Sequence, residues 1–76
     1  METIIKILNN LKPGVDFTAE KDLVNRQILT SMEIMLLTGE LNDAFDIEIT
    51  LPYIIPENFS SAEAIYDMVQ RIEEDE

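Results

Sequence analysis

The spacing of apolar residues is the feature of this sequence that most limits its fold. In three stretches the apolar residues recur every three or four positions, which places them on one face of a helix. These stretches are residues 2–11, 30–45 and a last one that begins near residue 60. The segment KPG at 12–14 ends the first stretch, and Pro52 and Pro56 exclude a long helix between the second and the third. The sequence therefore predicts an all-α fold.

The segments between the helices are predicted to be irregular but packed. Residues 15–29 lack a clear period, yet they are too apolar for a free linker, so we expect a long loop whose side chains hold it to the core. Residues 46–59 alternate briefly at Ile47 to Ile49, but no second strand exists to pair with them. The segment PENF at 56–59 offers one short helical turn. We expect one domain, 1–76, with three main helices, one short helix and a long first loop.

Hydroxyl residues mark the starts of the second and last helices. Thr30 followed by Glu33, and Ser60 followed by Glu63, fit the capping box, in which each residue's side chain bonds the other's backbone N–H. Thr30 is therefore predicted to cap the second helix, which leaves Ser31 in its first turn without a capping role. The last helix is predicted to bury Ala62, Ile65, Val69 and Ile72.

The second helix carries two apolar groups. The predicted core stripe consists of Ile34, Leu37, Leu41, Ala44 and Phe45. A second group, Met32, Met35 and Leu36, lies on another side of the helix, next to the acidic residues Glu33, Glu40 and Asp43. Exposed apolar clusters mark binding surfaces, and methionine adapts to several partners. The second group is predicted to bind partner proteins; alternatively, Phe17 or Leu29 from the loop covers Met32.

The charge of the chain narrows the class of partner. It has 16 acidic and 5 basic residues, a formal net charge of -11 at pH 7. Such a charge repels phosphate backbones and anionic membranes, and it favours docking on proteins with Lys and Arg patches. Solubility alone is the alternative explanation. No apolar run is long enough to span a membrane and the first residues lack a signal-peptide pattern, so we expect a cytoplasmic protein. From the charge we expect that it binds neither nucleic acid nor membrane. We expect a monomer.

The residue types present argue against catalysis by this chain alone. It has no histidine and no cysteine, so a Ser or Cys nucleophile has no histidine partner and any thiol must be imported. Asp43, Asp46 and Glu48 do not have the spacing of a calcium loop, and we expect no metal site. Ser31, at a helix N-terminus, is instead well placed to carry a phosphate, because the free N–H groups there stabilise an anion.

Two segments resemble the acyl carrier protein family, and with the loop before them the resemblance covers nearly the whole chain. They read LTSMEIMLLTGELNDAFDIEI and PENFSSAEAIYDMV, and the preceding GVDFTAEKDLVNRQI is similar to the family's long first loop. The resemblance is to stand-alone carriers. It implies a small four-helix bundle of acyl-carrier type, with Ser31 as the attachment point of 4'-phosphopantetheine, a covalent cofactor that a phosphopantetheinyl transferase takes from coenzyme A. The thiol of that group would hold an acyl or aminoacyl cargo as a thioester.

The resemblance also implies partners and shows two departures. The partner-binding residues would be Met32, Glu33, Met35, Leu36, Glu40 and Asp43. They would be read by the transferase and by an acyl- or aminoacyl-activating ligase, ketosynthase or acyltransferase with a basic docking surface. Thr30 replaces the aspartate that usually precedes the serine, which puts contacts to the transferase in question. Leu36 replaces a more polar residue, which suggests a more selective partner surface.

Several functions therefore remain open on the sequence. The leading hypothesis is a non-catalytic carrier in fatty-acid-like, polyketide or other specialised biosynthesis. The first alternative is an unmodified acidic helical module that regulates a partner enzyme, and it is supported by Thr30. More remote are a D-alanyl or other amino-acid carrier charged by an adenylating ligase, and a small metal-binding protein.

Overall fold

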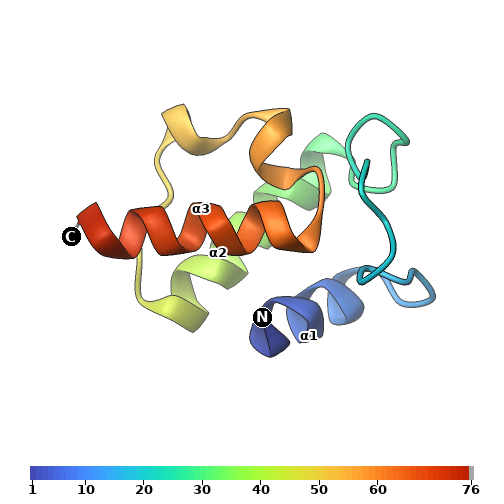
Figure 1. The fold of residues 1–76 in the computed structure, drawn as a ribbon, viewed down its shortest axis with the longest axis horizontal. Coiled ribbons are helices and arrows are strands. Elements are labelled where there is room, and N and C mark those ends of the chain that lie inside the picture. Colours follow the sequence, from blue (N-terminus) through green and yellow to red (C-terminus); the bar gives the residue numbers. More distant parts are fainter. Residues whose placement is uncertain (76) are drawn as a thin grey trace.

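The computed structural model describes residues 1–75, and these form helices joined by loops (Figure 1). The α-helices are α1 (Glu2–Leu11), α2 (Ser31–Phe45) and α3 (Ala62–Asp75), and two 3₁₀ helices, η1 (Leu51–Tyr53) and η2 (Pro56–Phe59), lie between α2 and α3. No strand occurs within residues 1–75. The predicted all-α class is confirmed, and the turn predicted at PENF is η2. The sequence did not predict η1, whose Pro52 suits the first turn of a helix.

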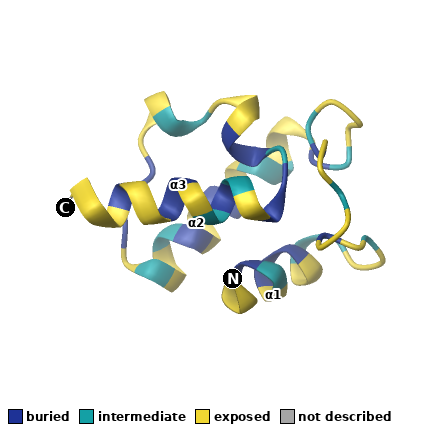
Figure 2. Cartoon of the chain, in the orientation of Figure 1, coloured by how far each residue is buried: buried dark blue, intermediate teal, exposed yellow. Residues whose placement is uncertain are grey.

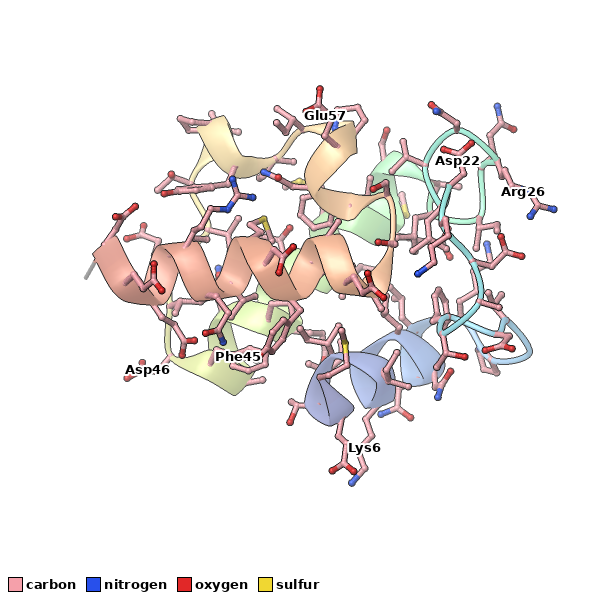
Figure 3. All side chains as sticks on the ribbon, in the orientation of Figure 1. Lys6, Asp22, Arg26, Phe45, Asp46 and Glu57 are labelled. Atoms are coloured by element: carbon pink, nitrogen blue, oxygen red, sulfur yellow. The ribbon has the colours of Figure 1, made fainter. Side chains whose placement is uncertain are left out.

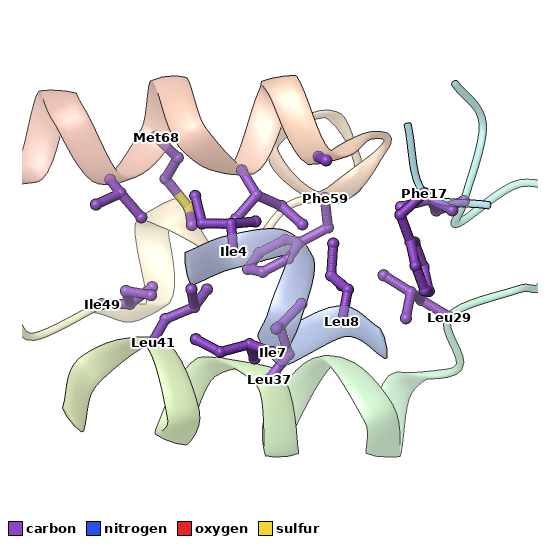
Figure 4. Close-up of a cluster of buried hydrophobic side chains, with 14 of the residues drawn as sticks. Ile4, Ile7, Leu8, Phe17, Leu29, Leu37, Leu41, Ile49, Phe59 and Met68 are labelled. Atoms are coloured by element: carbon purple, nitrogen blue, oxygen red, sulfur yellow. The ribbon is translucent and has the colours of Figure 1, made fainter. Parts of the chain in front are cut away.

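The helices enclose one apolar core. α1 packs against both α2 and α3, and η2 packs against α3. Figure 4 shows side chains from these elements meeting around Phe59, which is fully buried together with Ile4, Leu8, Leu37 and Leu41. Burying one such side chain stabilises a fold by about 1.5–3 kcal/mol. The opposite sides of α2 and α3 are exposed (Figure 2), so each helix has one inner and one outer face.

Local backbone preferences end the first two helices. α1 stops at Leu11 because the next residue, Lys12, precedes a proline and leaves the helical region, with φ at -141°. Gly14 then turns the chain with φ at +91°, a conformation that favours glycine. α2 ends at Phe45, because the next residue, Asp46, is left-handed with φ at +52° and donates its N–H to the carbonyl of Asn42.

The long loop between α1 and α2 is held to the core, as predicted. Phe17, Leu23 and Leu29 are buried. The Leu23 N–H donates to the carbonyl of Ser60 at 2.8 Å, and the Leu29 N–H donates to the carbonyl of Leu23 at 3.0 Å. The first of these bonds joins the loop to the turn before α3. The loop therefore has a defined position beside the start of α2.

Two details of the prediction are wrong. Ser60 does not cap α3, because its hydroxyl donates to the carbonyl of Glu57 at 3.0 Å in η2. Ser61 caps the helix instead, accepting the Ala64 N–H at 3.1 Å. Glu63, the expected partner of Ser60, forms an ion pair with Lys21 at 3.2 Å.

The buried face of α2 is turned slightly from the predicted stripe. Leu37 and Leu41 are buried and Ile34 and Phe45 partly so, but Ala44 is exposed and Thr38 is buried in its place. Thr38 can be buried because its hydroxyl donates to the carbonyl of Ile34 at 2.8 Å. In α3 the four predicted residues are buried, as is Met68, which the prediction omitted.

Candidate functional site

The start of α2 is fixed by the predicted capping box. The Thr30 hydroxyl accepts the N–H of Glu33 at 3.3 Å, and the Glu33 carboxylate accepts the N–H of Thr30 at 2.9 Å. The same carboxylate oxygen lies 3.3 Å from the ammonium of Lys12, just after α1. The hydrogen bond from the Thr30 N–H is the main cause that lowers the pKa of Glu33, and Lys12 adds to it. The cap therefore also ties α2 to the end of α1.

Ser31 is the first residue of α2, and its side chain is exposed. Its hydroxyl makes no hydrogen bond to any other atom of residues 1–75. N–H groups in the first turn of a helix lack carbonyl partners and attract anions. Because Thr30 and Glu33 complete the cap, a group attached to Ser31 would not disturb the start of the helix.

Two hollows flank Ser31. The α2–η2 groove, of about 270 Å³, runs between α2 and residues 54–59. Besides Ser31, its lining is Val24, Ile34, Met35, Ile54, Ile55, Pro56 and Phe59. The loop-side hollow, of about 350 Å³, is lined by Val24, Gln27, Leu29, Thr30, Ser31 and Ile34. Ser31 thus stands at the edge of an apolar groove and of a more polar hollow. Sequence reasoning missed both hollows, because they form only when distant segments fold back on α2.

The three apolar residues predicted to bind partners are on the outer side of α2. The exposed fractions are 75% for Met32, 62% for Met35 and 55% for Leu36. The loop does not cover Met32, since Phe17 and Leu29 are both buried in the core. Met35 belongs to two parts of the site, because it is exposed on the outer side of α2 and also lines the α2–η2 groove.

The acidic residues named with them differ in their environment. Glu40 and Asp43 are exposed. Glu33 is half-buried and bound to both Thr30 and Lys12, so its first role is in the cap. Two exposed apolar residues were not predicted: Leu51, the first residue of η1, and Ile55, which directly precedes η2. The sequence signal for them was weak, because an apolar residue in an irregular segment has no helical face to assign it to.

The charged residues are mostly on the outside of the molecule (Figure 3). Figure 3 shows Lys6 pointing outward from α1, Asp22 and Arg26 on the long loop, and Asp46 at the end of α2. Within residues 1–75 no group of three or more acidic, histidine or cysteine side chains is placed to hold a metal ion. None of the helices in this part of the chain has the length and apolar composition needed to cross a membrane.

Comparison of the chain with family models, with curated proteins and with solved structures finds no match.

Proposed function

We propose that this chain is a carrier protein of acyl-carrier type, with η2 as the short fourth helix of the bundle. It holds an acyl or aminoacyl group as a thioester on 4'-phosphopantetheine attached to Ser31, and it delivers that group to partner enzymes. One observation carries the proposal: the Ser31 hydroxyl is exposed and unbonded at the N-terminus of α2, between two hollows, while its neighbour Thr30 forms the cap.

Attachment to Ser31 needs chemistry from outside the chain. The Ser31 oxygen attacks the phosphorus of coenzyme A that bears the pantetheine arm, a phosphodiester forms, and adenosine 3',5'-bisphosphate leaves. The hydroxyl proton goes to a base on the transferase, since this chain has no histidine and the nearby Glu33 carboxylate is bound in the cap. Once bound, the cofactor supplies the thiol that this cysteine-free chain lacks. The phosphodiester would lie at the first-turn N–H groups of α2.

The two hollows suit the arm and its cargo. The loop-side hollow offers the polar side chains of Gln27 and Thr30 next to Ser31. The α2–η2 groove offers mainly apolar side chains, among them Ile34 and Ile54. An apolar part of the cargo gains about 25 cal/mol for each Å² that it buries there. These surroundings support a cargo with an apolar portion.

The outer face of α2 is the proposed docking surface. Met32, Met35 and Leu36 form its apolar centre, with Glu40 and Asp43 exposed beside them. The partners would be a phosphopantetheinyl transferase and an activating ligase, ketosynthase or acyltransferase with basic residues around an apolar recess. Opposite charges would speed their encounter, so salt should slow it.

Mass spectrometry tests the proposal. The purified protein is incubated with coenzyme A and each of several phosphopantetheinyl transferases, and its intact mass is recorded. The mass should rise by one phosphopantetheine, and Ser31→Ala should abolish the rise. Ser60→Ala is the matched control, because it removes a hydroxyl outside the site and should leave the rise intact. No gain with any transferase, for a folded protein, would contradict the proposal.

One observation favours a second candidate, an unmodified acidic module that regulates a partner. Thr30 stands directly before Ser31, and its hydroxyl is engaged in the cap. Because a threonine side chain has no carboxylate, this position presents none to a transferase. Thr30→Asp separates the two functions, because aspartate also caps helices well. If Thr30→Asp is modified and the natural sequence is not, the threonine blocks modification, which contradicts the carrier proposal and favours the second candidate. If both are modified, the carrier function stands.

A further inference from the structure

A buried amide links residues 50–59, the segment that carries η1 and η2, to α3. Asn58 is only 8% exposed, and both ends of its side-chain amide are used. Its NH₂ group donates to the carbonyl of Tyr53 at 2.8 Å, and its oxygen accepts from the guanidinium of Arg71 at 3.0 Å. A hydrogen bond from a charged donor is stronger than one between neutral groups. Asn58 therefore holds the segment's backbone on one side and α3 on the other.

A second contact joins the same segment to α3. The Tyr53 hydroxyl donates to the carboxylate of Asp75 at 3.1 Å. Arg71 and Asp75 are four residues apart, so they lie on the same face of the helix. Arg71 is oriented from within α3 as well, because its Nε donates to the carbonyl of Asp67 at 3.4 Å. The segment is thus attached to α3 at two points one helical turn apart.

The attached segment is also one wall of the α2–η2 groove. Ile54, Ile55 and Pro56 line the groove next to Ser31, whereas neither Asn58 nor Arg71 does. The segment contains only the short helices η1 and η2, so its own hydrogen bonds do little to hold its position. The bonds of Asn58 to Tyr53 and to Arg71 lie outside the lining of the groove, and they attach its wall to α3.

We propose that Asn58 and Arg71 are positioning residues that set the width of the α2–η2 groove and so limit the size of the apolar group that it admits. That this group is the cargo on Ser31 rests on the proposed function. The effect on the groove itself does not, because both contacts exist in the chain without any attached group.

Hydrogen exchange on the unmodified protein tests the attachment. The N–H groups of Tyr53, Ile54 and Asn58 are bonded within the segment and report its opening. In Arg71→Gln the exchange of these N–H groups should speed up about tenfold. A tenfold change corresponds to the free energy lost with one hydrogen bond to a charged group. Arg71→Lys, which keeps a cationic donor, should restore most of the protection. Lys21→Gln is the control: it also removes one positive charge and an α3 contact, the ion pair with Glu63, and should leave these N–H groups unchanged.

Ligand binding tests the effect on size. The unmodified protein is titrated with N-phenyl-1-naphthylamine, a bulky neutral probe, and with 1-hexanol, a slender one. In Arg71→Gln and Asn58→Asp the affinity for the bulky probe should rise relative to hexanol, by about fourfold for each methylene-sized increment of buried surface. Asn58→Asp loses the donor to Tyr53 but keeps the oxygen that faces Arg71.

Three results would overturn the proposal. The first is equal acceleration of exchange at Leu8 of α1 and at the segment, which would show only a loss of global stability. The second is an effect of Lys21→Gln as large as that of Arg71→Gln. The third is an unchanged ratio of the two probe affinities. Neither experiment uses attachment to Ser31, so both can be interpreted even if the proposed carrier function is wrong.

Discussion

At the scale of single residues, the two adjacent hydroxyls at the start of α2 have different environments. The Thr30 side chain completes a capping box, and the Ser31 hydroxyl is exposed and unbonded. This division was predicted from the sequence, because the residue three positions after Thr30 is a glutamate. The same pattern misled the prediction at Ser60, whose hydroxyl is used by η2 while Ser61 caps α3. A capping pattern is reliable only where no neighbouring turn competes for its hydroxyl.

Substituting the two hydroxyls separately should show which one stabilises the helix. Thr30→Ala removes the acceptor for the Glu33 N–H and should lower the free energy of unfolding by about 1 kcal/mol. Ser31→Ala removes no hydrogen bond and should change it by less than about 0.5 kcal/mol. Urea denaturation followed by circular dichroism measures both. Equal losses would mean that Ser31 shares the cap.

The lowered pKa of Glu33 predicts how stability depends on pH. A carboxylate whose pKa is lower in the folded protein stabilises the fold above its ordinary value of 4.5, and this stabilisation is lost as the pH falls through the lowered value. Glu33→Gln keeps an oxygen that can accept the Thr30 N–H but cannot ionise. The natural protein should therefore be more stable than Glu33→Gln at pH 7, with the difference shrinking below pH 4.5.

The difference between the two proteins isolates Glu33. The pKa of Asp16 is lowered too, by hydrogen bonds from the hydroxyl and then the backbone N–H of Thr18, but Asp16 is present in both proteins and cancels. Denaturation at a series of pH values checks the prediction. A difference that stays constant from neutral to acidic pH would show that the charge of Glu33 does not contribute.

At the scale of elements, α2 has an inner and an outer face, with Gly39 exposed on the outside. A Cβ atom at this position would meet nothing within 4 Å. Gly39→Ala should therefore raise the free energy of unfolding by about 1 kcal/mol, the difference in helix propensity between the two residues. Urea denaturation measures it. An unchanged or lower stability would show that the fold itself requires a residue without a side chain at this position.

Helical spacing predicted the elements better than it predicted the site. Apolar positions every three or four residues were enough to place all three α-helices and most of the core, because each helix buries one face. The α2–η2 groove could not be predicted in this way. It depends on how the segment carrying Ile54 and Ile55 folds back on α2, and the bonds of Asn58 that fix this segment reach Arg71 on another helix. Polar contacts between distant segments leave no period in the sequence.

At the scale of the whole molecule, most of the positive charge is already engaged. Lys12, Lys21 and Arg26 form ion pairs and Arg71 binds Asn58, out of 5 basic residues against 16 acidic ones. The surplus carboxylates repel one another in the folded chain more than in the unfolded one. Screening of these three ion pairs by salt should cost the fold little stability, because ion pairs on the surface contribute little to the free energy of unfolding.

Salt should therefore stabilise the protein. The screening length falls from about 30 Å at about 0.01 M salt to about 3 Å at about 1 M. Over this range of sodium chloride the melting temperature should rise by about 4–8 °C, which is equivalent to about 1 kcal/mol for a domain of this size. Circular dichroism thermal melts measure it. A fall in melting temperature with added salt would mean that the ion pairs outweigh the repulsion.

The bond between Leu23 and Ser60 has a consequence for the order of folding. It joins the long loop to the turn before α3, and such contacts between distant segments form slowly because the chain between them must be closed. We therefore expect the loop to dock last. Leu23→Ala, which empties a fully buried position, should then speed unfolding about a hundredfold and leave the folding rate nearly unchanged in stopped-flow measurements. Ser31 would acquire its surroundings only in the final step, so an enzyme that recognises them would distinguish the finished protein from a chain still folding.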